Sequence, residues 1–275
     1  MKGLYLAKNR RPLLKEIIIS IQSFIQANEF IRRHKLWKWI LVPGIVYAIL
    51  FMISMYFFGK TSSQFIEWLS LKTGLSNWVS RMQSSLLGFL FTLSGLIFWL
   101  IQMMLYFSLF KYVILIIGSP VFTYLSEKTE AIIAGRELKF RLTELRADMT
   151  RGIRVALRNA FWQTIYTLSI LILSIIPVVG WATPLMAVIN ECFYWGFSMV
   201  DYNNARRNMS VNNSIYYITH HKGLATGNGL LFYLMHLVPF LGWVLAPAYA
   251  IIAATLSMHA IQEKPGIIDN HLGHS

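Results

Sequence analysis

The 275-residue chain is 56% hydrophobic and 13% charged, and it carries a formal net charge of +13. Soluble domains average roughly 45–50% apolar and about 25% charged residues, so this composition excludes an ordinary soluble fold. Stretches without Asp, Glu, Lys or Arg cover residues 39–59, 82–110, 159–190 and 223–262, and each exceeds the roughly 18 residues of a transmembrane candidate. We therefore expect an all-α integral membrane protein.

Residues 1–36 predict a basic N-terminus followed by an amphipathic helix. Apolar residues recur at helical spacing from Leu14 to Ile31, while Lys15, Glu16 and other polar residues fall largely elsewhere. Such a helix can lie on an anionic membrane surface, or pack its stripe on the rest of the protein, or do both. No apolar signal core with a cleavage site follows the basic residues, so we expect no cleavage.

Two transmembrane helices are expected next. Residues 37–58 would extend about 33 Å at 1.5 Å per residue, which is enough to cross the hydrocarbon. We expect a polar loop over residues 59–81 that contains a short amphipathic helix. The second span, residues 82–118, is expected to end near the Gly-Ser-Pro sequence at 118–120, because proline removes a helix hydrogen bond.

Two similar breaks interrupt the apolar stretches that follow. Residues 175–184 read IIPVVGWATP, and residues 237–247 read LVPFLGWVLAP. A proline breaks the helix and a glycine permits the backbone to reverse, so each break predicts the turn of a helical hairpin. The hairpins are expected over residues 159–200 and 223–262. The predicted turn residues are Pro177, Gly180, Pro239 and Gly242.

Both hairpins belong to a single helical membrane domain, expected over residues 37–262 and followed by a C-terminal tail at 263–275. Their arms would measure about 25 Å, which is short for a hydrocarbon core of about 30 Å. We therefore expect hairpins that penetrate part of the bilayer and return. A turn that stays inside the bilayer would be covered by protein or line a cavity, because unsatisfied backbone groups are costly in lipid.

The distribution of basic residues predicts the orientation. Residues 1–38, the charged segment 126–158, residues 201–222 and the C-terminus together carry 21 Lys and Arg, against three in the 59–81 loop. Cytoplasmic segments are enriched in Lys and Arg, so we expect both termini in the cytoplasm. The same bias accounts for the net charge without a nucleic-acid partner.

No catalytic motif stands out. The sequence contains no phosphate loop, HExxH helix, nucleophile elbow or paired-cysteine motif, and Cys192 is its single cysteine. We therefore predict no catalytic residues, no metal, no cofactor and no enzymatic activity. Glu191 is a candidate of another kind, because an acid within an apolar segment serves a function, is ion-paired between helices or lies near the membrane interface.

Two basic clusters are candidates for binding anions. Arg151, Arg154 and Arg158 form a stripe on one helix face, which can bind lipid headgroups, pair with acids or attract an anionic solute. We expect Arg154 and Arg158 to join Glu127 and Glu130 in a cytoplasmic-side network that holds the long second helix to the first hairpin. The second cluster combines cations with the free amides of a helix start. It comprises Arg32, Arg33, Lys35 and Lys38.

Several further motifs follow one another in a specific order. The stretch SPVFTYLSEKTEAIIAG at 119–135 places a small residue and a proline before two acids three residues apart, Glu127 and Glu130, and then a glycine. IIPVVGWATP, the pair Asp201-Tyr202 and the stretch 239–255 continue the pattern. Over roughly residues 20–262, the chain resembles the family of CysZ sulfate permeases and eukaryotic etoposide-induced endoplasmic-reticulum proteins.

The resemblance implies two long spanning helices, two partly inserted hairpins, oligomers whose protomers pack antiparallel in some members, and high-affinity sulfate uptake for cysteine synthesis. It places a sulfate site at the start of the first spanning helix, where the matching positions are Lys35, Leu36, Trp37 and Lys38. The family has a glycine and an arginine pair there, whereas this chain has Lys35 and the Trp-Lys pair. Lysine is a point charge without the bidentate fork of arginine.

Taken together, these features predict an anion permease of the bacterial inner membrane, with sulfate as the first candidate substrate. We expect membrane lipids, an anionic solute and further copies of the chain as partners. The alternative is a non-transporting membrane scaffold or lipid-handling protein with the same fold.

Overall fold

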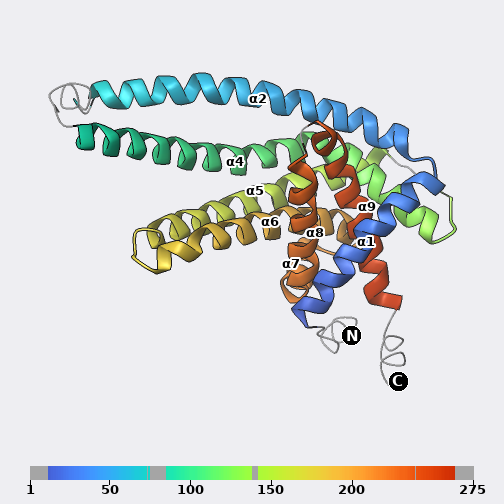
Figure 1. Cartoon of the computed structure of the whole chain (residues 1–275). Helices are drawn as coiled ribbons and strands as arrows, with labels where there is room; N and C mark the ends of the chain where they lie inside the picture. The colour runs from blue at the N-terminus through green and yellow to red at the C-terminus, as the bar shows by residue number, and fades with distance from the viewer. Residues whose placement is uncertain (1–11, 73, 75–84, 138–141, 239, 264–275) are drawn as a thin grey trace. The chain divides into compact units, whose positions relative to one another are not determined.

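The computed structural model describes residues 12–72, 74, 85–137, 142–238 and 240–263. All regular elements in this part of the chain are helical, which confirms the all-α class. In chain order they are α1 (Leu13–Arg33), α2 (Trp37–Lys72), α4 (Ser85–Ile133), α5 (Leu142–Leu173), the 3-10 turn η1 (Val179–Ala182), α6 (Thr183–Arg206), α7 (Val211–His220), α8 (Lys222–His236) and α9 (Leu241–Glu263) (Figure 1).

Three stretches of helix are long and apolar enough to cross a membrane, where the sequence predicted two transmembrane helices. They are Trp37–Leu69, Gly95–Ile133 and Leu241–Ile261. The third belongs to the second hairpin, whose returning helix begins at Leu241 and contains Pro247 in its interior. This arm therefore continues through the second proline of the break and is long enough to span.

The chain divides into two compact units, Met1–Ala48 with Ile114–Ser275 and Ile49–Val113. In the smaller unit, the later part of α2 and the first described part of α4 run antiparallel. The Phe58 ring lies 5.0 Å from that of Tyr106, and the hydroxyl of Ser62 donates to Gln102 Oε1 at 2.9 Å. Many apolar side chains point outward here, as lipid-facing residues do.

Both expected transmembrane helices continue beyond their predicted ends. The prediction of a loop over residues 59–81 was wrong up to Lys72, because α2 continues there. Phe65 of α2 stacks on Phe98 of α4, with ring centroids 6.2 Å apart. The predicted stop at 118–120 was also wrong, since α4 contains Pro120 and ends at Ile133. Burial of apolar residues beyond Pro120, such as Phe122 and Leu125, stabilises the helix past this break.

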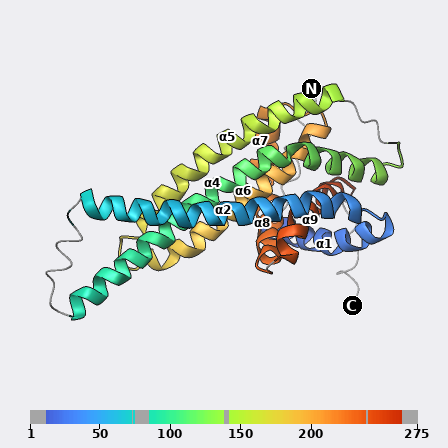
Figure 2. The ribbon, with the colours of Figure 1, turned by 90° about the horizontal axis from the view of Figure 1, so that it is seen from above.

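Helix α6 lies at the centre of the larger unit, where it packs on α5, α8 and α9 (Figures 1 and 2). Trp195 is buried, and its ring stacks on Phe232 of α8 at 4.0 Å between centroids. Close contact between α6 and α8 requires Gly196, since a Cβ there would lie 1.8 Å from the carbonyl oxygen of Ala225.

Helix α1 has two apolar stripes. One includes Phe24, Ala27 and Ile31, which are buried in a helix that packs on α8 and α9. The other is exposed and contains Leu14 and Ile25, among others. The first stripe therefore stabilises the protein core, while the second leaves an apolar surface of the kind that an interfacial helix presents to a membrane.

The two breaks turn by the same backbone device. Val178 has φ 71° and Phe240 has φ 60°, so in each break the residue after the proline adopts the left-handed conformation. We had predicted that the glycine reverses the chain, and this was wrong. Pro177 lies at the end of the α5 arm, while Pro239 falls outside the described residues.

The glycines instead permit close backbone approach. The amide of Gly180 donates to Ile176 at 2.8 Å, and that of Gly242 donates to Val238 at 2.9 Å. A Cβ would lie 2.5 Å from a carbonyl oxygen at Gly180 and 2.0 Å from one at Gly242. Both turns therefore close a tight hydrogen bond that a side chain at this position would obstruct.

Candidate anion site

A tight corner joins α1 to α2. The amide of Leu36 donates to Ile31 at 3.1 Å and the amide of Lys35 donates to Arg32 at 3.3 Å, which is the bonding pattern of a Schellman cap. Leu36 and Ile31 are fully buried, as the hydrophobic contact of this motif requires. Lys35 has φ 52°, a conformation that glycine adopts without strain and that costs other residues roughly 1 kcal/mol.

The corner presents four cations to solvent. Each has an exposed side chain, and they fall within seven consecutive residues at the N-terminal end of α2. The first turn of a helix has amides without intrahelical partners and carries partial positive charge, so cations and backbone reinforce one another there. The corner can therefore attract a small dianion. The four are Arg32, Arg33, Lys35 and Lys38.

A fifth cation lies at this corner that the sequence reasoning missed. The ring of Trp39 lies 4.4 Å from that of Tyr124 on α4, and Lys128 places its Nζ 4.7 Å from the Trp39 centroid. This cation–π contact fixes the ammonium group beside the start of α2. Lys128 stands between Glu127 and Glu130 in the sequence, and only helical periodicity signals that it points away from them.

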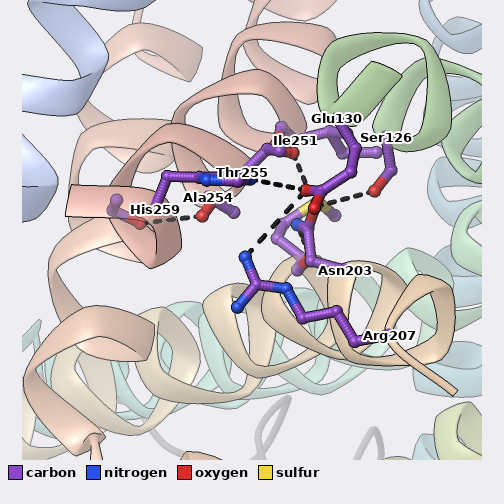
Figure 3. A network of polar contacts seen from close by, with 10 residues as sticks. Ser126, Glu130, Asn203, Arg207, Ile251, Ala254, Thr255 and His259 are labelled. Atoms are coloured by element: carbon purple, nitrogen blue, oxygen red, sulfur yellow. Dashed lines mark hydrogen bonds and ion pairs between the residues drawn. The ribbon is translucent and has the colours of Figure 1, made fainter. Parts of the chain in front are cut away.

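The polar network predicted near Glu127 and Glu130 centres on Asn203 of α6 (Figure 3). The hydroxyls of Ser126 and Thr255 donate to Asn203 Oδ1 at 2.7 and 2.6 Å, and all three residues are buried. Glu130 lies 2.8 Å from His259 Nε2 and 3.9 Å from the Arg207 guanidinium. The network therefore joins α4, α6 and α9 through buried polar groups, which are costly to separate once paired.

The partners of the two glutamates differ from those we predicted. Glu127 pairs with Arg206 at 3.1 Å, so it does hold α4 to the first hairpin, but through α6. Arg154 is exposed, and Arg158 donates to the neighbouring Asn159 Oδ1 at 3.1 Å. The prediction that these two arginines join Glu127 and Glu130 in one network was therefore wrong. Sequence spacing could not reveal Arg206, which lies 79 residues from Glu127.

The first residue of the arginine stripe has a separate buried partner. Arg151 of α5 pairs with Asp201 of α6 at 3.0 Å, and the Ser214 hydroxyl of α7 donates to the same carboxylate oxygen at 2.5 Å. The adjacent Tyr202 donates to the carbonyl of Leu115 at 2.8 Å. Burial raises the pKa of the Tyr202 phenol above its usual value, so it stays protonated as a donor. The Asp201-Tyr202 pair therefore orders the base of the first hairpin.

Glu191 of α6 is hydrogen-bonded to side chains of two neighbouring helices. Gln163 of α5 donates to Glu191 Oε1, and the hydroxyl of Tyr233 on α8 donates to Oε2 at 2.8 Å. Both carboxylate oxygens are thus held by the neighbouring helices. We therefore interpret Glu191 as a polar contact between α5, α6 and α8, made through the neutral donors Gln163 and Tyr233.

Most of the chain, including the α1–α2 corner, is similar to known membrane proteins. Residues 23–247, which include all four exposed cations of the corner, match the family described as Sulfate transporter CysZ/Etoposide-induced protein 2.4. The chain is 28% identical over 232 residues to the Sulfate transporter CysZ of Pseudomonas paraeruginosa (strain DSM 24068 / PA7), covering 83% of this chain and 89% of the relative. The Sulfate transporter CysZ of Pseudomonas aeruginosa (strain LESB58) is 27% identical over the same length, with the same coverage.

Proposed function

Because this chain belongs to the Sulfate transporter CysZ/Etoposide-induced protein 2.4 family, we propose that it is a membrane permease for sulfate-type anions. The Pseudomonas relatives named sulfate transporters match most of the chain, and three helical stretches are long enough to cross a bilayer. The single observation that carries the proposal is the family match over residues 23–247, a region that contains the exposed cationic corner. The protein would move anions rather than transform them.

We place the anion-binding step at the α1–α2 corner. Exposed Lys35 and Lys38, with Arg32 and Arg33 on the preceding turn, surround a helix N-terminus. Sulfate is a dianion that accepts hydrogen bonds, so it would be held by charge and by backbone amides together. Lys128 would add a further positive charge from α4. Lysines bind as point charges, so we expect weaker geometric selection than an arginine pair gives.

The orientation follows from charge. We propose that the chain lies in a bacterial inner membrane with both termini on the cytoplasmic side, because 21 Lys and Arg fall on the segments that would lie there and three on the opposite loop.

We also propose that the chain forms homo-oligomers in a lipid environment. The exposed apolar faces of α2, α4 and the first hairpin are available for contact with lipid or another copy.

The test is sulfate binding to the purified protein. Replacing Lys38 with Glu changes a nearby charge by two units, and Coulomb's law for a dianion about 6 Å away in water gives roughly 100-fold weaker binding. Titration calorimetry would measure this change. The matched control is Lys72→Glu, the same substitution at the exposed far end of α2. Equal sulfate affinity in wild type and Lys38→Glu would remove the corner from the mechanism.

A second function is supported by one specific departure. Where the resemblance implies a glycine and an arginine pair, the corner has Lys35, Trp37 and Lys38. A scaffold or lipid-handling protein of the same fold would retain the architecture and lose the anion specificity. A ligand that binds the folded state raises its stability by mass action. Sulfate would therefore stabilise a permease that binds it but would not stabilise such a scaffold.

A further inference from the structure

An open groove of about 770 Å³ lies along the first hairpin, within the larger unit. One stripe of α5, from Arg158 to Leu173, forms one wall, and the α6 stripe from Met186 to Phe197 forms another. The N-terminal ends of α1 and α8 close the third side. The volume lies within the roughly 300–1,000 Å³ typical of ligand pockets. Its described lining residues do not include the cations of the α1–α2 corner, so it is a separate feature.

The groove is cationic at one end and apolar at the other. Arg158 lies over the Phe197 ring at 5.9 Å, and the Arg158 bond to Asn159 uses one of its five N–H donors. Lys222 begins α8 and is exposed. The first turns of α8 lie against α6 at Gly196, which places Lys222 at the same end as Arg158. The opposite end, next to the hairpin turn, is lined by Leu173 and Met186.

The length of the groove matches one lipid molecule. Fifteen residues separate Arg158 from Leu173 on α5, which is about 22 Å at 1.5 Å per residue. One leaflet including headgroups is half of about 40–45 Å, or roughly 20–22 Å. Trp162, Tyr166 and Tyr194 line the groove between the two ends, where amphipathic rings suit the boundary of headgroups and chains.

We propose that this groove binds one anionic phospholipid. Its phosphate lies between Arg158 and Lys222, and an acyl chain follows Ile170, Leu173 and Met186 toward the hairpin turn. A purely apolar helix from a second copy would leave both cations without a counter-charge. A phospholipid supplies the phosphate and the apolar chain in one molecule, so it complements both ends of the groove. The site does not depend on sulfate transport.

Lipid retention by the purified full-length protein tests the proposal. Native mass spectrometry would count bound molecules while palmitoyl-oleoyl-phosphatidylglycerol, or phosphatidylcholine with the same chains, is titrated in detergent. We expect the tightest phosphatidylglycerol site to weaken about fivefold for Arg158→Gln or Lys222→Gln and roughly 30-fold for both, at about 1 kcal/mol per charge. Arg154→Gln is the matched control, because this exposed arginine one turn earlier on α5 does not line the groove.

A second variant separates a lipid from a free anion. Ser169 lines the groove and is exposed, so Ser169→Trp fills the chain end while leaving both cations in place. We expect this variant also to lose the tight phosphatidylglycerol site. Unchanged lipid binding in Ser169→Trp would show that only the headgroup charge matters and would overturn the proposal. An equal loss of phosphatidylglycerol binding in Arg154→Gln would also overturn it. The same holds if Ser169→Trp disrupts an oligomer of the chain and leaves lipid binding intact.

Discussion

The two hairpins of this protein have turns of the same conformation and differ in how the helices beyond the turn are packed. In the first, α5–α6, the turn residues Val178 and Trp181 are 82% and 91% exposed. In the second, α8–α9, Phe240 and Leu241 at the turn are also exposed, but the returning helix is buried soon after it, with Ala246, Ala250 and Ala254 fully enclosed. A repeated Pro and Gly-Trp pattern therefore specifies how the chain turns, while the residues beside it decide whether the hairpin is exposed or packs in the protein core.

Side-chain size explains the difference. Small residues along α9 allow α1, α6 and α8 to approach it closely, as small residues do in membrane helix contacts. Gly44 on α2 lies against the start of α9, where a Cβ would be 2.0 Å from the carbonyl of Val244. The first hairpin instead presents exposed residues such as Leu168 and Ile172. It is the hairpin that leaves an apolar face exposed, and it carries the groove.

The turn glycines give the largest expected difference between the hairpins. We expect Gly242→Ala to lower the free energy of unfolding by about 3 kcal/mol, because its Cβ would meet the carbonyl of Met235 in a packed site. Gly180→Ala should cost about 1 kcal/mol, since the exposed turn can shift. Thermal unfolding in one detergent would measure both. Equal losses would contradict the contrast in packing.

The two turn tryptophans give a smaller difference. Trp243 is half-buried and its ring lies 5.2 Å from that of Phe240, so Trp243→Ala should cost about 1–2 kcal/mol of unfolding free energy. Trp181→Ala should change it by less than about 0.5 kcal/mol, because the side chain is almost fully exposed. Unfolding of the two variants side by side checks this. A larger loss for Trp181 would place its turn against protein rather than lipid.

Much of the fold could be predicted because apolar periodicity and breaker residues act locally. The amphipathic first helix, the two long helices and both hairpin turns follow from such signals, whereas α7 was not predicted. The ends of α2 and α4 could not be predicted, since contacts such as Phe65 with Phe98 override the local stop signals. The left-handed residues were also missed, because Val178 and Phe240 are poor choices for that conformation. Both side chains are exposed, and it is the hydrogen bonds from Gly180 and Gly242 that close the two turns.

The candidate site was predicted only in part. The cationic corner is contiguous in sequence, so its residues could be found by inspection. The partners of Glu127 and Glu130 could not, since Arg206, Arg207 and His259 lie far from them in the sequence. Lys128 reaches the corner through an aromatic contact with Trp39, for which a sequence contains no spacing rule.

Sulfate uptake into liposomes tests the central claim most directly. Wild type, Lys38→Glu and Lys72→Glu would be reconstituted at equal density and supplied with radiolabelled sulfate, with chloride and phosphate as competitors. The account predicts saturable uptake that is selective for sulfate, lost in Lys38→Glu and kept in Lys72→Glu. Folded and inserted wild-type protein that takes up no more sulfate than empty liposomes would contradict it.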